Sequence, residues 1–395
     1  MKKGINCIQC KGKLLCGLNK CPVFEKINTK ETINDKLKKD FRSITPEVLI
    51  GWHNYPQVNA GIIAPYEVIK TQEPREWVLN KTPINEIMNY RLKLINSHNK
   101  VNIKELKGFN ELIQQTALSS KPLSIDVSLK NKPVITNNFD IHAQPYGPSG
   151  DVNKIELIDK PTIKKAVQIT HYDTDLKANE AINYLKSKGL EEYEISNLLS
   201  AGTLGVEKTR KLVPTRWSIT ATDDAISKEN INKIKQNEII DTYTVFNGRY
   251  LGNNFTIILL PRLWSYELIE MWQPGAVFSS NETQVMTDYE EYNGRKEYAA
   301  NTGGGYYASR LPITEWLIDN KTQASILAIR QITKDYYMPL GVWVVREAVR
   351  KTLKNQPKKF TDYALAKEYI TRITGYDIRK TRTINNTQTR INNYL

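Results

Sequence analysis

Four cysteines, the only ones among the 395 residues, follow the pattern C-x2-C-x5-C-x4-C near the start of the chain. This spacing allows the thiolates of Cys7, Cys10, Cys16 and Cys21 to converge on one ion, and a segment this short would not fold without it. Zinc is the preferred ion because a closed tetrathiolate site suits a metal without redox chemistry. An iron–sulfur cluster is the alternative, favoured by the Cys21-Pro22 pair but not by the C-x5-C spacing.

The last eight residues, Q-T-R-I-N-N-Y-L, place a glutamine and three apolar side chains in an otherwise polar segment. One tight helical turn would bring Ile391, Tyr394 and Leu395 onto one face and leave Gln388 able to hydrogen-bond backbone groups. This is the spacing of peptides that bind the PCNA sliding clamp, with Tyr-Leu in place of two aromatic residues. A chance match in a polar tail is the alternative.

Residues 211–224, K-L-V-P-T-R-W-S-I-T-A-T-D-D, combine groups that bind nucleotides. We expect a strand over 217–222, on which alternate side chains share a face. A guanidinium can bind phosphate oxygens while an indole stacks on a base, so the candidate DNA- or nucleotide-binding residues are Thr215, Arg216, Trp217 and Ser218. The alternative is structural, with Trp217 in the core and Asp223 or Asp224 starting the next helix.

The segment H-Y-D-T-D places His171, Asp173 and Asp175 at alternating positions of an expected loop. Together with Asp223 and Asp224 they are candidate catalytic residues, which could share a divalent ion in the core or act as acid and base. The alternative is a capping turn, because a helix is expected from Asp175 onward.

The glycine-rich run N-T-G-G-G-Y-Y-A-S-R, residues 301–310, could present backbone amides to a phosphate, with Arg310 behind them. It lacks the spacing of a P-loop or of a dinucleotide-binding motif. His53, His98 and His142 stand alone in the sequence and are interpreted as structural. The familiar hydrolase, zinc-protease and kinase motifs do not occur, so whether the chain is an enzyme stays open.

Positive charge is concentrated at the two ends of the chain. Residues 1–43 hold eleven Lys and Arg against four Asp and Glu, and residues 350–395 hold eleven against three, whereas the chain between them is close to neutral. Such ends can bind a polyanion, although a lysine-rich proteome would give the same pattern. No stretch has the length and apolar character of a membrane span or a signal peptide, so we expect a cytoplasmic protein.

Hydrophobic periodicity predicts interspersed helices and strands, and therefore an α+β body. Helices are expected over 83–98, 103–118, 175–188, 191–201, 340–353 and 362–373, and strands over 122–129, 153–158, 217–222, 239–246 and 255–261. The predicted organisation is a metal-binding module over 1–28, a basic linker over 29–43, a core over 44–375 and a flexible tail over 376–395. If the core has two lobes, the break between them is expected near 205–215.

Several long strings resemble the archaeal DNA-repair proteins called Nre. They are the cysteine pattern, V-P-T-R-W-S-I-T-A-T-D-D, G-G-G-Y-Y-A-S-R-L-P and the C-terminal peptide, with G-P-S-G-D-V-N-K-I-E-L and H-Y-D-T-D-L-K-A-N-E-A between them. The resemblance covers essentially the whole chain. It implies a role in the repair of damaged DNA, recruitment by PCNA and a zinc-finger-like N-terminus, but brings no catalytic residues with it.

The leading hypothesis is a repair factor that binds PCNA through its tail and DNA through the cysteine module and the face around Arg216. A metal-dependent nuclease or nucleotide-processing enzyme is the first alternative. An RNA-binding or ribosome-associated zinc protein is the second, since short four-cysteine modules also bind RNA.

Overall fold

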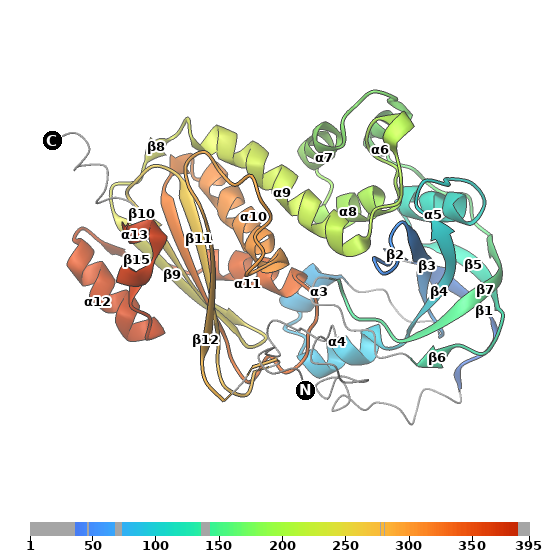
Figure 1. Cartoon of the computed structure of the whole chain (residues 1–395), viewed down its shortest axis with the longest axis horizontal. Helices are drawn as coiled ribbons and strands as arrows, with labels where there is room; N and C mark the ends of the chain where they lie inside the picture. Colours follow the sequence, from blue (N-terminus) through green and yellow to red (C-terminus); the bar gives the residue numbers. More distant parts are fainter. Residues whose placement is uncertain are drawn as a thin grey trace. The chain divides into compact units, whose positions relative to one another are not determined.

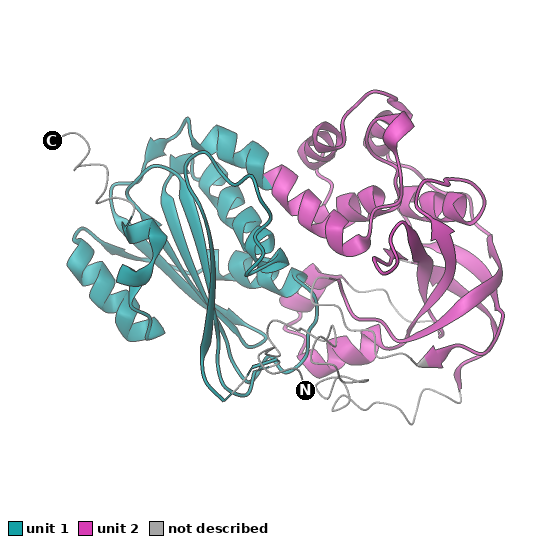
Figure 2. Cartoon of the chain, viewed as in Figure 1, with its two compact units in different colours: residues 1–19, 227–395 teal, residues 20–226 magenta. Residues whose placement is uncertain are grey.

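The computed structural model of the chain describes residues 36–45, 47–67, 73–135, 143–276, 278–279 and 281–385. They divide into two compact units, which Figure 2 colours separately: the N-terminal unit up to Ile226 and the C-terminal unit from Ser227 onward. The boundary lies inside helix α9 (Thr215–Ile234), later in the chain than the break that was expected near 205–215. Each unit has its own sheet, which confirms an α+β fold with interspersed helices and strands.

The N-terminal unit is built on a sheet whose described strands run in the order β1-β5-β7-β4-β3-β2, with β6 paired to β7. Neighbouring strands are antiparallel except β4 and β7, which are parallel. The strands are β1 (Asp40–Thr45), β2 (Glu47–Ile50), β3 (Gln57–Pro65), β4 (Leu94–Asn102), β5 (Leu123–Leu129), β6 (Val134–Ile135) and β7 (Pro148–Leu157).

One face of this sheet is apolar because alternate residues of its strands are aliphatic. Val58, Ala60 and Ile62 of β3 lie on this face and pack with Ile125 and Val127 of β5. Helix α5 contributes Ile113 and Ala117 to the same core. The helices of this unit are α3 (Pro74–Leu79), α4 (Ile84–Arg91), α5 (Phe109–Leu118), α6 (Lys165–Tyr172), α7 (Ala178–Ser187), α8 (Glu192–Ser200) and the 3-10 turn η2 (Glu207–Thr209).

The C-terminal unit contains a mixed sheet in the order β12-β11-β14-β10-β9-β15, in which β11 and β14 are the parallel pair. Figure 1 shows this sheet with β9, β10, β11 and β12 labelled. A short parallel pair, β8 with β13, lies apart from it. The strands are β8 (Glu238–Ile239), β9 (Tyr243–Tyr250), β10 (Asn253–Leu260), β11 (Ser265–Trp272), β12 (Gln284–Glu290), β13 (Thr322–Gln323), β14 (Ser325–Ile332) and β15 (Lys358–Phe360).

Helices cover both faces of this second sheet. Tyr266 of β11 bonds to Ser309 of α10 on one face, whereas Ile269 of the same strand packs with Ile370 of α12 on the other. The helices are α10 (Gly304–Asp319), α11 (Trp343–Leu353), α12 (Tyr363–Thr374), the 3-10 turn η3 (Ile378–Lys380) and α13 (Arg382–Asn385). The predicted helices over 340–353 and 362–373 are therefore confirmed.

The predicted strand over 217–222 is wrong, because these residues form the first turns of α9. Their alternation of polar and apolar types, with β-branched Ile and Thr, imitates a strand. The buried residues of the helix include Ser218, Thr222, Ala225 and Ile226, which follow helical spacing. Pro214 accepts the first helical hydrogen bonds, from Trp217 and Ser218, so the helix starts directly after it. A separate helix starting near Asp223 does not exist.

Three other boundaries differ from expectation. The expected helix over 83–98 ends at Arg91, and strand β4 begins at Leu94. The first residues of β4 are buried on both faces of the sheet, so the sequence there lacks the alternation of polar and apolar residues that indicates a strand. The last residues of the segment 29–43, expected as a basic linker, belong to strand β1, which begins at Asp40. Residues expected in the tail from 376 include Ile378, which is buried in the core of the C-terminal unit. Helix α6 was not predicted, since 171–175 was interpreted as a loop.

In the described part of the chain, no helix is both long enough and apolar enough to cross a lipid bilayer.

Candidate nucleic-acid interface

The loop between β2 and β3 forms one half of the candidate site. The amide of Gly51 donates to the carbonyl oxygen of Asn59 at 2.7 Å, and the amide of Gln57 donates to the carbonyl oxygen of Asn54 at 2.9 Å. A side chain at position 51 would come within 3.1 Å of the Asn59 carbonyl oxygen, so glycine allows the strands to close tightly there. The loop carries three rings in four residues: Trp52, His53 and Tyr55.

The first residue of α9 fixes this loop against the helix. The amide of Ile50, the last residue of β2, donates to the Thr215 hydroxyl oxygen at 2.9 Å. The Ser200 hydroxyl donates to the carbonyl oxygen of Val213 at 2.8 Å, and its oxygen lies 3.1 Å from that of Thr215. Because the Ser200 proton points to Val213, the Thr215 hydroxyl donates to Ser200. Thr215 therefore joins β2 to the end of α8 as well as to α9.

This attachment brings the rings of the loop onto the next two residues of α9. The guanidinium carbon of Arg216 lies 4.8 Å from the centroid of the Trp52 ring, within cation–π range. The His53 ring stacks on Trp52, with the two ring centroids 3.9 Å apart. Trp217 and Tyr55 lie 5.1 Å apart with their ring planes tilted by 55°. Together they form one surface, the aromatic surface, which consists of Trp52, His53, Tyr55, Arg216 and Trp217.

Two rings of the aromatic surface are accessible to solvent. Trp217 exposes 44% of its surface and Tyr55 exposes 40%, although both are large apolar side chains. Arg216 supplies a positive charge at the rings, and the sequence from 208 to 216 contains no acidic residue. Exposed rings beside a cationic side chain are features by which proteins bind nucleic acids without sequence preference.

Of the predicted nucleotide-binding residues, Thr215, Arg216 and Trp217 thus come together at the start of α9. Ser218 does not point outward: it is buried, and its hydroxyl donates to the carbonyl oxygen of Thr215 at 2.9 Å. Trp217 is not a core residue, which removes the structural alternative for it. The sequence reasoning missed Trp52, His53 and Tyr55, although three rings in four residues were visible in G-W-H-N-Y-P.

His171, Asp173 and Asp175 belong to a turn that follows α6. The Asp173 carboxylate accepts from the amides of Asp175 and Leu176, at 3.3 and 3.0 Å, as in an Asx turn. The His171 ring donates from Nδ1 to the carbonyl oxygen of Thr203 at 3.1 Å. Burial is the main cause that lowers the pKa of His171, and the positive charge of Arg210 lowers it further.

Arg210 holds this turn in place. Its guanidinium donates to the carbonyl oxygens of Gly205, His171 and Asp173, each at 2.7 Å. One planar side chain thereby satisfies three backbone groups of two segments that are distant in sequence. The cluster is a structural turn between α6 and α7, but its aspartates do not cap the next helix, because the N-cap of α7 is Lys177.

The predicted catalytic residues do not form one group. Asp223 is only 1% exposed and lies on α9 with Asp224, whereas His171, Asp173 and Asp175 lie in the turn after α6. Among the described residues, no three or more His, Cys, Asp or Glu side chains are close enough together to hold a metal ion. The proposed divalent-ion site built from these five residues is therefore not observed.

Arg310 is enclosed within the C-terminal unit. It is 1% exposed, lies in α10 and donates to the Glu290 carboxylate at 2.6 Å. Its guanidinium carbon also lies 5.5 Å from the ring centroid of Tyr306 and 5.4 Å from that of Tyr307. The glycine run before it is not an open loop, because α10 begins at Gly304. The expectation of a phosphate loop with Arg310 behind it is wrong in this respect.

His98 and His53 are less isolated than the sequence indicated. Nδ1 of His98 lies 3.3 Å from a carboxylate oxygen of Asp151, while burial is the main cause that lowers the pKa of His98. His53 is part of the aromatic surface. His142, the four cysteines and the predicted PCNA-binding residues 388–395 lie outside the described residues.

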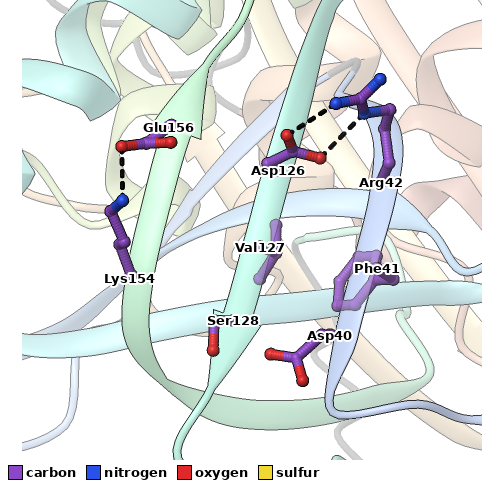
Figure 3. Close-up of a pocket in the computed structure, with 8 residues that line it drawn as sticks. All are labelled: Asp40, Phe41, Arg42, Asp126, Val127, Ser128, Lys154 and Glu156. Atoms are coloured by element: carbon purple, nitrogen blue, oxygen red, sulfur yellow. Dashed lines mark hydrogen bonds and ion pairs between the residues drawn. The ribbon is translucent and has the colours of Figure 1, made fainter.

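A shallow hollow of about 330 Å³ lies over strands β1, β5 and β7 (Figure 3). Four of its charged side chains form two ion pairs, Arg42 with Asp126 at 2.9 Å and Lys154 with Glu156 at 2.7 Å, and Asp40 also lines it. None of the predicted site residues lines it, and its mixed charges favour no class of ligand.

Comparison with known sequences identifies the family. A profile described as "Archaeal Nre, N-terminal" matches residues 15–279, and one described as "Archaeal Nre, C-terminal" matches residues 290–394. The chain belongs to the archaeal Nre family. All five residues of the aromatic surface fall within the Nre N-terminal match, and Arg310 falls within the Nre C-terminal match.

Three relatives extend the Nre match over most of the chain. The DNA repair protein NreA of Archaeoglobus fulgidus is 36% identical over 366 residues, which cover 91% of each chain. NreB of the same organism, also a DNA repair protein, is 35% identical over 378 residues, 95% of this chain and 94% of NreB. NreA of Haloferax volcanii is 32% identical over 345 residues, 82% of each. The chain is thus a DNA repair protein of the Nre family, and no solved structure matches it.

Proposed function

We propose that this Nre protein is a repair factor that binds DNA through the aromatic surface. The observation that carries the proposal is the attachment of the loop after β2 to the start of α9, which places Arg216 over Trp52 and Trp217 beside Tyr55. Arginine contributes charge-assisted hydrogen bonds to phosphate, and exposed rings contribute stacking. Both contributions fit a DNA repair protein better than they fit a purely structural contact, which would bury the rings.

The test compares two arginines of the same unit. In full-length protein at one fixed salt concentration, Arg216→Ala is expected to raise the Kd for DNA about tenfold, the effect of losing a charged hydrogen-bonding group. Arg42→Ala is the matched control, since Arg42 is an exposed arginine that pairs with Asp126 outside the surface. Equal affinity of wild type and Arg216→Ala would overturn the proposal. Stronger binding of structured RNA than of DNA would favour the RNA-binding alternative instead.

Recruitment by the PCNA clamp is the second part of the proposal. Its support is the spacing of Gln388, Ile391, Tyr394 and Leu395 in the sequence. PCNA is expected to capture the full chain and to lose it when residues 388–395 are deleted. Undiminished capture of the shortened chain would remove this role from the C-terminal peptide.

The third part is a structural zinc ion held by Cys7, Cys10, Cys16 and Cys21, with the neighbouring lysines contacting DNA. The support is the chemistry of the donor set, four thiolates at a spacing that allows tetrahedral coordination. Metal analysis of purified protein is expected to give one zinc per chain, lost in Cys7→Ser. Iron with the visible absorbance of a cluster would establish the alternative.

A further inference from the structure

We infer that the aromatic surface binds unpaired nucleotides of DNA and stacks a base on Trp217 and Tyr55. This inference rests on the proposed function, since it specifies the form of DNA that the same surface recognises. A base that is paired within a duplex has its faces covered by the neighbouring bases, so it cannot stack on a protein ring. Bases in single strands, gaps and bulges expose these faces.

The exposure of the two rings is the first reason. Trp217 and Tyr55 are 5.1 Å apart and tilted by 55°, so their rings are not stacked on each other. Both are about two-fifths exposed, whereas the N-terminal unit buries another tryptophan, Trp77, completely. An exposed indole that contacts an exposed phenol provides the ring faces on which a base can stack.

The rigidity of the surface is the second reason. The bonds from Ile50 to Thr215 and from Gly51 to Asn59, both under 3 Å, fix the loop at its first residues. The amide of Gln57 donates to Asn54 and closes the loop at its other end. Little conformational entropy is then lost when a base binds, so the stacking energy appears in the affinity.

The charge beside the rings is the third reason. Arg216 directly precedes Trp217, and its guanidinium carbon lies 4.8 Å from the centroid of the Trp52 ring. A nucleotide stacked on Trp217 keeps its phosphate a few ångströms from the base. Arg216 is therefore suited to the phosphate while the ring holds the base.

The experiment measures the ratio of two dissociation constants. Full-length protein is titrated into labelled oligodeoxynucleotides of one length: a single strand, a perfect duplex and a duplex with a central unpaired stretch. Trp217→Ala is expected to raise the Kd for the single strand and the interrupted duplex about fivefold or more, as loss of one stacked base does, and to leave the perfect duplex within about twofold.

Three further variants make the result specific. Trp217→Phe retains a ring and is expected to preserve most of the affinity for single strands. Tyr172→Ala, which removes a ring that is 73% exposed elsewhere in the same unit, is the matched control and is expected to change neither constant. If Trp217→Ala does not fold, Tyr55→Ala tests the same surface from the loop, with a smaller but parallel effect.

Two outcomes separate this inference from the proposed function. If Trp217→Ala weakens single strand and perfect duplex by the same factor, the surface binds DNA but not unpaired bases, and the inference is wrong while the proposed function stands. If neither Trp217→Ala nor Arg216→Ala changes the affinity for any of the three DNAs, both are wrong.

Discussion

The backbone amide of Ile50 donates a hydrogen bond of 2.9 Å to the hydroxyl oxygen of Thr215, although 165 residues separate the two in the sequence. This bond joins the end of β2 to the start of α9. Thr215→Val keeps the shape of the side chain but leaves the Ile50 amide without its acceptor. We expect the free energy of unfolding in urea to fall by about 1–3 kcal/mol, the cost of an unsatisfied buried donor.

Thr215→Ser is the control for this hydrogen bond, because it retains the hydroxyl group. The free energy of unfolding and the DNA affinity of Thr215→Ser are both expected to stay close to those of the wild type. A stable Thr215→Val together with a destabilised Thr215→Ser would mean that the methyl group, and not the hydrogen bond, is what the position requires.

Arg210 is expected to be essential to the turn that contains His171 and Asp173. Its three hydrogen bonds to carbonyl oxygens, each 2.7 Å long, need a planar guanidinium with several donors. Arg210→Lys retains the charge but cannot reach all three oxygens, so we expect a loss of about 3 kcal/mol in urea unfolding. Lys208→Ala, in an exposed neighbour, is the comparison. A lysine variant as stable as wild type would show that the charge alone suffices.

The buried pair of Arg310 and Glu290 is expected to act on stability. Both side chains are enclosed, so Arg310→Met leaves a carboxylate buried without this partner. Removal of one member of such a pair costs about 3–5 kcal/mol. The double variant Arg310→Met with Glu290→Gln is expected to recover part of this loss, because no buried charge remains unpaired. A fully stable Arg310→Met with weaker DNA binding would instead restore Arg310 as a ligand residue.

The stability of the N-terminal unit is expected to fall as the pH drops below 6.5, the ordinary pKa of histidine, because of His171. Burial lowers the pKa of this imidazole in the folded state below its ordinary value of 6.5. As the pH falls through 6.5, the unfolded chain therefore takes up a proton that the folded chain does not, and folding loses free energy. His171→Asn cannot titrate, so its loss of stability on acidification should be smaller than that of the wild type. Parallel pH profiles of the two proteins would refute this.

The fold was predictable where local patterns agree with burial. The strand over 122–129 alternates between buried and half-buried residues and appears as β5, and the amphipathic helix over 175–188 appears as α7, which buries one face. Prediction failed where the two disagree. Leu94 and Ile95 extended a helical pattern because both faces of β4 are buried there, and the start of α9 resembled a strand because its buried positions are occupied by Ser218 and Thr222.

Half of the candidate site was visible in the sequence. Arg216 and Trp217 were identified from their residue types, even though their helix was interpreted as a strand. Trp52 and Tyr55 were not, because only the tertiary fold brings the loop after β2 to α9 across more than 150 residues. The converse error concerns Arg310, whose glycine neighbours resemble a phosphate loop in sequence but begin a helix in the structure.

Photochemical cross-linking tests the binding surface most directly. Single-stranded DNA that contains 5-iododeoxyuridine is irradiated with the full-length protein, and the joined peptides are located by mass spectrometry. Because this base reacts with rings on which it stacks, the cross-links are expected at Trp217 and at the peptide that contains Trp52 and Tyr55. Cross-links confined to other peptides, with these two unmodified, would contradict the assignment of DNA binding to the aromatic surface.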